Sequence, residues 1–205
     1  MKFLSKLLDR VNIWPIVNSH FDTFYDYNKL YNEGIRKIPV YDFILFLVLP
    51  TLSSLMFIFL FKFNFDKDKI NLLVTSLTIF TGLLLSLLVL LFDLGRKEKE
   101  TFSTIPIDQI QKHNLSKNKI TLVGEVFSNV LYSILTSALA ILFCLLTQMS
   151  RVSIIYDNVP LQVYLILKFI LLKALSFVAL FLLFQFFLSL LMIIKRFKIL
   201  YDLGF

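Results

Sequence analysis

INLLVTSLTIFTGLLLSLLVLLFD, residues 70–93, decides the fold of this chain. Its first 23 residues carry no charge. As a helix rising about 1.5 Å per residue they would cover roughly 34 Å, more than the hydrocarbon core of a bilayer at about 30 Å. The stretch therefore predicts a transmembrane helix. Small and polar residues recur along one face of it, at steps of three, four, four and seven: Thr75, Thr78, Gly82, Ser86 and Asp93.

The composition places the whole chain among integral membrane proteins. Of its 205 residues, 58% are hydrophobic and 23 are phenylalanine, which is outside the range of soluble globular domains. The formal charge of +7 does not predict nucleic-acid binding as a main role, because the basic residues flank apolar runs as topology signals do. Cys144 is the only cysteine, so we expect no disulfide framework and no cysteine-based metal site.

Three further apolar runs predict three more membrane spans. Residues 43–61 form the first, which Pro50 should kink, with Thr51, Ser53 and Ser54 available to the backbone groups that the proline frees. Residues 126–146 form the third and residues 163–194 the fourth. Within the fourth, Lys168 and Lys173 are expected near the outer end, either snorkelling to the interface or acting in selectivity or gating. The predicted fold is all-α, with four transmembrane helices arranged as two hairpins.

The distribution of Lys and Arg predicts the orientation. Fifteen of the 21 basic residues lie in the N-terminal segment, the middle connection and the C-terminal tail, against four in the other two connections. Basic residues concentrate on the cytoplasmic side, so both termini and the middle connection are expected there. The chain then divides into a cytoplasmic helical collar (1–42), a first hairpin (43–93), a basic cytoplasmic loop (94–124), a second hairpin (125–194) and a cytoplasmic tail (195–205).

The collar is predicted to contain two helices. The first, over residues 3–11, is amphipathic, and it either lies in the lipid headgroup region or docks on the protein's own surface. The second should start at a cap, Asn18 or Ser19, and end near Gly34. It would carry a run of aromatic residues that either pack at a subunit interface, surround a ligand or lie on the lipid: Phe21, Phe24, Tyr25, Tyr27 and Tyr31.

No common catalytic signature is present. The chain has no Walker-type glycine loop, no GxSxG, no HExxH and no CxxC pair, so the sequence predicts neither an enzyme nor a cofactor. His20 and His113 have no nearby His or Cys that would complete a metal site, and we expect both at the cytoplasmic surface.

A second polar stripe follows on the third span, at the helical spacing of the first: Glu125, Asn129, Ser133 and Thr136. Such stripes either make close helix contacts or line a pore. Asp93 and Glu125 would stand at the cytoplasmic ends of their spans. They could form carboxylate rings at the inner mouth of a symmetric oligomer, or pair locally, Asp93 with Arg96 or Lys97 and Glu125 with Lys119. One four-helix protomer has little room for a channel, so a pore would need several copies.

The layout resembles a family of bacterial membrane proteins. The segments HFDTFYDY, TGLLLSLLVLLFDLGRK and EVFSNVLYSIL, with four spans behind a cytoplasmic start, are similar to small four-helix effectors of anti-phage defence, of the Hailong type. The resemblance implies a homo-oligomeric ion channel in the bacterial inner membrane. It also implies a nucleotidyltransferase partner, whose nucleotide-derived product controls opening and hence depolarisation of an infected cell. No ligand-contact motif identifies binding residues within the collar or the basic loop.

The sequence therefore leaves two classes of function open. The first is a ligand-controlled homo-oligomeric pore lined by residues of the two stripes. The second is a non-conducting membrane scaffold or sensor that recruits a cytoplasmic partner through the collar and the basic loop. A small transporter subunit is a further alternative, with Pro50 as the one break in a span.

Overall fold

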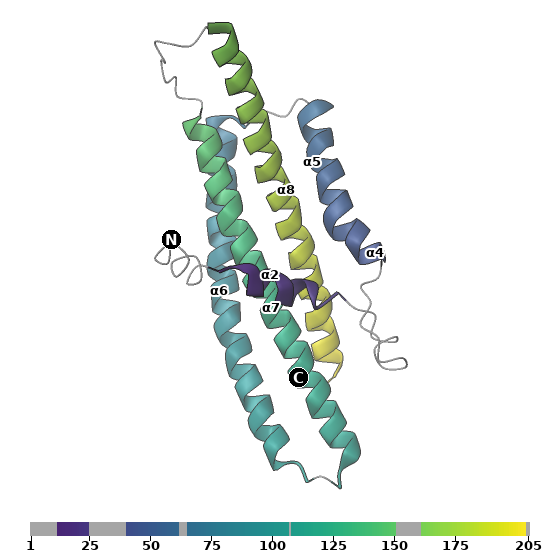
Figure 1. Cartoon of the computed structure of the whole chain (residues 1–205). Helices are drawn as coiled ribbons and strands as arrows, with labels where there is room; N and C mark the ends of the chain where they lie inside the picture. The colour runs from purple at the N-terminus through teal and green to yellow at the C-terminus, as the bar shows by residue number, and fades with distance from the viewer. Residues whose placement is uncertain (1–11, 25–39, 62–64, 107, 151–160, 204–205) are drawn as a thin grey trace, which may run out of the picture. The chain divides into compact units, whose positions relative to one another are not determined.

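A computed structural model of the chain describes residues 12–24, 40–61, 65–106, 108–150 and 161–203 (Figure 1). All regular structure within these residues is helical. The elements are α2 (Trp14–Phe21), α4 (Val40–Phe43), the π-helix η1 (Ile44–Val48), α5 (Leu49–Phe59), α6 (Lys67–Thr104), α7 (Ile110–Met149) and α8 (Leu161–Asp202). Four helices are long and apolar enough to cross a membrane: Val40–Phe59, Lys67–Thr104, Ile110–Met149 and Gln162–Asp202. The prediction of an all-α fold with four such helices is confirmed.

The long helices extend well beyond the apolar runs that predicted them. The basic segment 94–124, expected as a loop, consists mostly of the end of α6 and the start of α7, and only residues 105–109 lie between them. Its Glu, Lys and Arg residues favour helix, and hydropathy marks where a helix is apolar rather than where it ends. The tail after residue 194 is helical for the same reason, because α8 continues to Asp202.

The chain forms two compact units. One comprises residues 1–39, 88–132 and 192–205, and the other comprises residues 40–87 and 133–191. Each of α6, α7 and α8 contributes one part to each unit. We call them the α2 unit and the α5 unit, after the helix that each holds alone.

The core of the α5 unit brings together side chains from α5, α6, α7 and α8, with Phe65 just before α6: Ile58, Phe65, Ile70, Cys144, Ala179 and Leu180. Hydroxyl groups add contacts between the long helices. Ser133 on α7 donates to the Ser189 hydroxyl on α8 at 2.7 Å, and the Thr81 and Ser137 hydroxyls of α6 and α7 also lie 2.7 Å apart. Small hydroxyl residues let helices approach closely in an apolar environment, and such bonds contribute about 0.6–2 kcal/mol each.

Pro50 is accommodated by a partner from another helix. Proline has no N–H, so the carbonyl of Phe46, four residues earlier, loses its usual α-helical donor. The Gln185 side chain on α8 donates to this carbonyl through Nε2. Two of the hydroxyls that were expected to bond the freed carbonyl donate elsewhere. Thr51 donates to the carbonyl of Leu47, and Ser54 donates to the carbonyl of Pro50 itself. The Phe46 carbonyl therefore accepts its hydrogen bond from a side-chain amide that is distant in sequence.

Replacing Gln185 with leucine is expected to destabilise the α5 unit by about 1–3 kcal/mol, because a buried carbonyl loses this donor. The loss should shrink when Pro50→Ala is also introduced, since the new N–H can donate to Phe46. Thermal unfolding of the detergent-solubilised protein, followed by circular dichroism in a double-mutant cycle, measures both effects. An equal cost of Gln185→Leu in the two backgrounds would contradict this account of Pro50.

Candidate functional site

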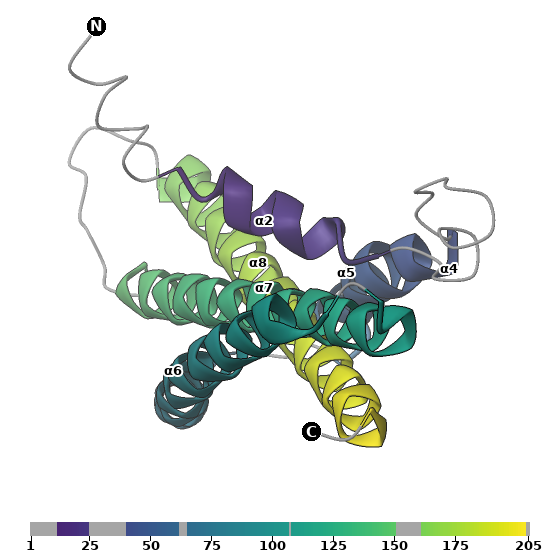
Figure 2. The same cartoon turned by 90° about the horizontal axis from the view of Figure 1, so that it is seen from below.

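Helix α2 begins at Trp14 and lies across α7 (Figure 1 and Figure 2). Pro15 in its first turn needs no hydrogen-bond acceptor, and the Asn12 side chain accepts the N–H of Trp14 at 3.0 Å. The predicted caps, Asn18 and Ser19, therefore lie inside the helix, which ends at Phe21. Outside the described part of the chain lie residues 3–11, the predicted helix end near Gly34, and Tyr25, Tyr27 and Tyr31.

His20 anchors α2 to α7. It is fully buried, and its Nδ1 lies 2.7 Å from Oδ1 of Asn129 on α7. Because an amide oxygen only accepts, Nδ1 donates. The imidazole also stacks on the Tyr132 ring, with centroids 3.7 Å apart and planes inclined by 4°. It makes a T-shaped contact with the Phe24 ring, with centroids 4.8 Å apart. The expectation that His20 lies at the surface was wrong.

Burial lowers the pKa of His20 from 6.5 to about 4. The hydrogen bond to Asn129 acts in the opposite direction, and the positive charge of Arg196 lowers the pKa further. His20 is therefore neutral at pH 7 while α2 is docked.

A buried ion pair extends the contact to α8. Nη1 of Arg196 lies 2.9 Å from Oε2 of Glu125, and the two side chains are only 9% and 8% exposed. Nη2 of Arg196 donates to the backbone oxygen of Thr23 at 2.7 Å, while the Thr23 hydroxyl donates to the oxygen of His20 at 2.6 Å. We call these joined residues the α2 anchor: His20, Thr23, Glu125, Asn129 and Arg196.

The two predicted polar stripes lie in different environments. On α7, Asn129, Ser133 and Thr136 are buried, and Glu125 belongs to the α2 anchor. On α6, the four residues of the stripe within the α5 unit are all exposed: Thr75, Thr78, Gly82 and Ser86. They lie opposite Leu77 and Leu84, which are buried on the same helix. Two hydroxyls of the α6 stripe donate to backbone oxygens of their own helix, Thr78 to that of Val74 at 2.7 Å and Ser86 to that of Gly82 at 3.2 Å.

The remaining predicted charges have local partners. Asp93 is exposed and lies 4.0 Å from Arg96, which is the local pairing given as an alternative to a carboxylate ring. Lys168 and Lys173 are half-buried on α8. The Nζ of Lys168 lies 5.7 Å from the centroid of the Tyr164 ring, and that of Lys173 lies 5.7 Å from the centroid of the Phe169 ring. These contacts are compatible with snorkelling along α8.

The described residues contain no group of three or more His, Cys, Asp or Glu side chains that could hold a metal ion. His113 lies beside the Phe102 ring, with centroids 4.3 Å apart. Sequence patterns therefore found the α7 members of the α2 anchor but missed His20, Thr23 and Arg196. Arg196 is the second residue after the last apolar run, where a basic residue counts as an ordinary topology signal.

Comparison with protein families, with curated proteins and with solved structures gave no match to this chain.

Proposed function

We propose that this chain is the subunit of a homo-oligomeric ion channel, inserted in a membrane with both termini in the cytoplasm. The observation that carries the proposal is the exposed stripe of α6. Thr75, Thr78, Gly82 and Ser86 present hydroxyls and a bare glycine on the exposed face of the charge-free part of α6, residues 70–92. A single copy would direct this face at lipid, whereas several copies arranged around it would enclose a path with polar walls.

The α2 anchor supports a role for α2 in control. Thr23, just after α2, receives a hydrogen bond from Arg196 on α8, and His20 bonds Asn129 on α7. Because α7 and α8 are both candidate membrane spans, a ligand or partner that displaced α2 would break contacts to two of them. The resemblance to anti-phage effectors suggests the setting: a bacterial inner membrane, and a signal made by a nucleotidyltransferase.

Single-cysteine variants test the pore directly. Cys144 is the only cysteine, so Thr78→Cys and Ser86→Cys can each be made in a Cys144→Ala background. A charged, water-soluble thiosulfonate is expected to modify both and to lower ion flux from proteoliposomes severalfold, because charged groups enter only hydrated positions. Leu83→Cys is the matched control, since Leu83 is 62% exposed on the same helix but outside the stripe. Flux is measured with and without products of the candidate nucleotidyltransferase.

Unmodified stripe cysteines, or modification without an effect on flux, would contradict the assignment of the stripe as the lining of a pore. A stable oligomer that binds the nucleotidyltransferase without conducting under either condition would favour the scaffold alternative.

A further inference from the structure

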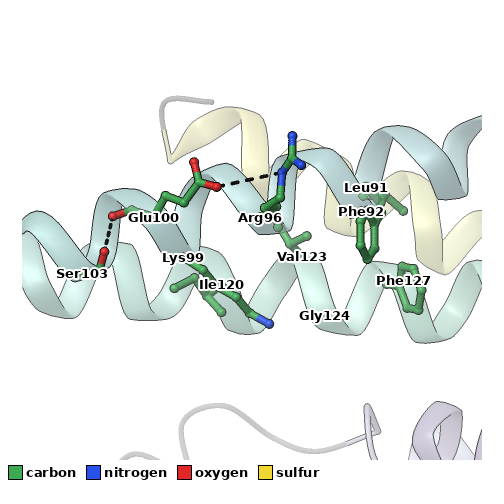
Figure 3. Close-up of a pocket in the computed structure, with 11 residues that line it drawn as sticks. Leu91, Phe92, Arg96, Lys99, Glu100, Ser103, Ile120, Val123, Gly124 and Phe127 are labelled. Carbon is green, nitrogen blue, oxygen red and sulfur yellow. Dashed lines mark hydrogen bonds and ion pairs between the residues drawn. The ribbon is translucent and has the colours of Figure 1, made fainter.

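A groove of about 700 Å³ opens between α6 and α7 within the α2 unit (Figure 3). We infer that this groove binds an anionic phospholipid, with an acyl chain along its apolar floor and the phosphate at its basic rim. The inference rests on the proposed function only for the insertion of α6 and α7 in a membrane.

Two glycines on facing helices shape the groove, Gly95 where the helices are close and Gly124 where space is open. A Cβ added to Gly95 would lie 3.4 Å from Cγ1 of Val123, so the helices are close there. A Cβ added to Gly124 would meet nothing within 4 Å, so the space beside it is open. Apolar side chains form the walls, with Phe92 and Phe127 at one end (Figure 3). A lining of this kind suits a hydrocarbon chain and offers little to a soluble anion such as a free nucleotide.

Two cations stand on the rim. Lys99 extends from α6 toward α7, and Arg96 lies one turn before it (Figure 3). Glu100 is also on the rim, but its carboxylate and that of Asp93 are each 4.0 Å from Arg96, at the limit for an ion pair. The guanidinium therefore retains donors for a phosphate, which arginine and lysine both bind well.

The groove lies along α6 at the level where the acyl chains of a lipid would meet its headgroup. The charge-free stretch of α6 ends at Phe92, and Arg96 and Lys99 follow it by about 6 Å and 10 Å at 1.5 Å per residue. The apolar lining thus lies at the end of the hydrocarbon core, and the cations lie at the level of the headgroups. Basic groups placed between membrane helices at this level recognise anionic headgroups.

Native mass spectrometry of the detergent-solubilised protein, titrated with phosphatidylglycerol or phosphatidylcholine, tests the site. We expect wild type to retain phosphatidylglycerol severalfold better than phosphatidylcholine. Gly124→Leu, which fills the open space, should reduce retention of both lipids severalfold, and the double variant Arg96→Ala, Lys99→Ala should remove only the preference. Thr121→Leu is the matched control, because Thr121 is exposed on the same helix, three residues before Gly124, but does not line the groove.

Excess inorganic phosphate should leave the bound lipid in place. Displacement by phosphate, equal retention of the two lipids by wild type, or unchanged retention by Gly124→Leu would each overturn the inference. Circular dichroism checks that the variants remain folded. Lipid retention is measured without ion flux, so a conducting protein that binds no lipid refutes this site alone, and a lipid-binding protein that does not conduct refutes the channel alone.

Discussion

Lowering the pH from 7 toward 4 is expected to release α2 from α7 and α8. The docked state holds His20 neutral, since burial lowers its pKa from 6.5 to about 4. The undocked state, with the ordinary pKa, binds the proton first. The contribution of His20 to docking is therefore complete above pH 6.5 and is lost progressively down to about pH 4. At 1.36 kcal/mol per pKa unit, the loss amounts to about 3 kcal/mol.

The surroundings of His20 give the protonated ring no ready compensation. Arg196 on α8 repels it, and the nearest carboxylate of the anchor, Glu125 on α7, is already engaged by that arginine. Asp22, which directly follows α2, is exposed. Protonation would also place a charge in a buried site, where the cost of desolvation outweighs the attraction of the stacked Tyr132 ring.

Trp14 makes the release measurable, because it is the only tryptophan and belongs to α2. Its fluorescence in the detergent-solubilised protein should change between pH 6.5 and 4. In His20→Gln, which keeps an amide donor and does not titrate, this change should disappear. His113→Gln removes the only other histidine and should leave the transition intact. A transition that persists in His20→Gln would mean that another group controls α2.

The sequence predicted the four long apolar helices well, because a long charge-free run has few alternatives to a helix long enough to span a membrane. It did not predict the different fates of the two polar stripes. Thr78 on α6 and Ser133 on α7 belong to similar patterns, yet the first is exposed and the second is buried against Ser189. Which face of a helix meets its neighbours depends on packing, and a periodic pattern on one helix does not contain that information.

The partners of the charged residues in the α2 anchor could likewise not be predicted from the sequence. Glu125 was predicted at a pore mouth or beside Lys119, and Arg196 was counted only as a cytoplasmic charge. Both predictions rest on neighbours in sequence, whereas the 2.9 Å ion pair joins residues 71 positions apart on α7 and α8. His20 reaches Asn129 across 109 positions. Contacts of this range leave no local signal in a single sequence.

Replacing Arg196 with methionine is expected to have the largest effect on stability, a loss of about 3–5 kcal/mol, because Glu125 would be left as an uncompensated buried charge. Lys198→Met is the matched control, since it removes the same charge from an exposed position of α8 and should change stability little. Thermal unfolding and Trp14 fluorescence together measure the loss of fold and of α2 docking. Equal effects of the two substitutions would contradict the buried pair.

The double variant Arg196→Met, Glu125→Leu separates the stability of the anchor from its role. Removing both charges avoids the uncompensated carboxylate, so much of the stability lost in the single variant should return. The bond from Arg196 to the Thr23 oxygen is still lost, and α2 should remain more easily displaced. If the α2 anchor controls a channel, this variant should fold and conduct but respond to its trigger at an altered concentration. An unaltered response in a stable double variant would confine the ion pair to a structural role.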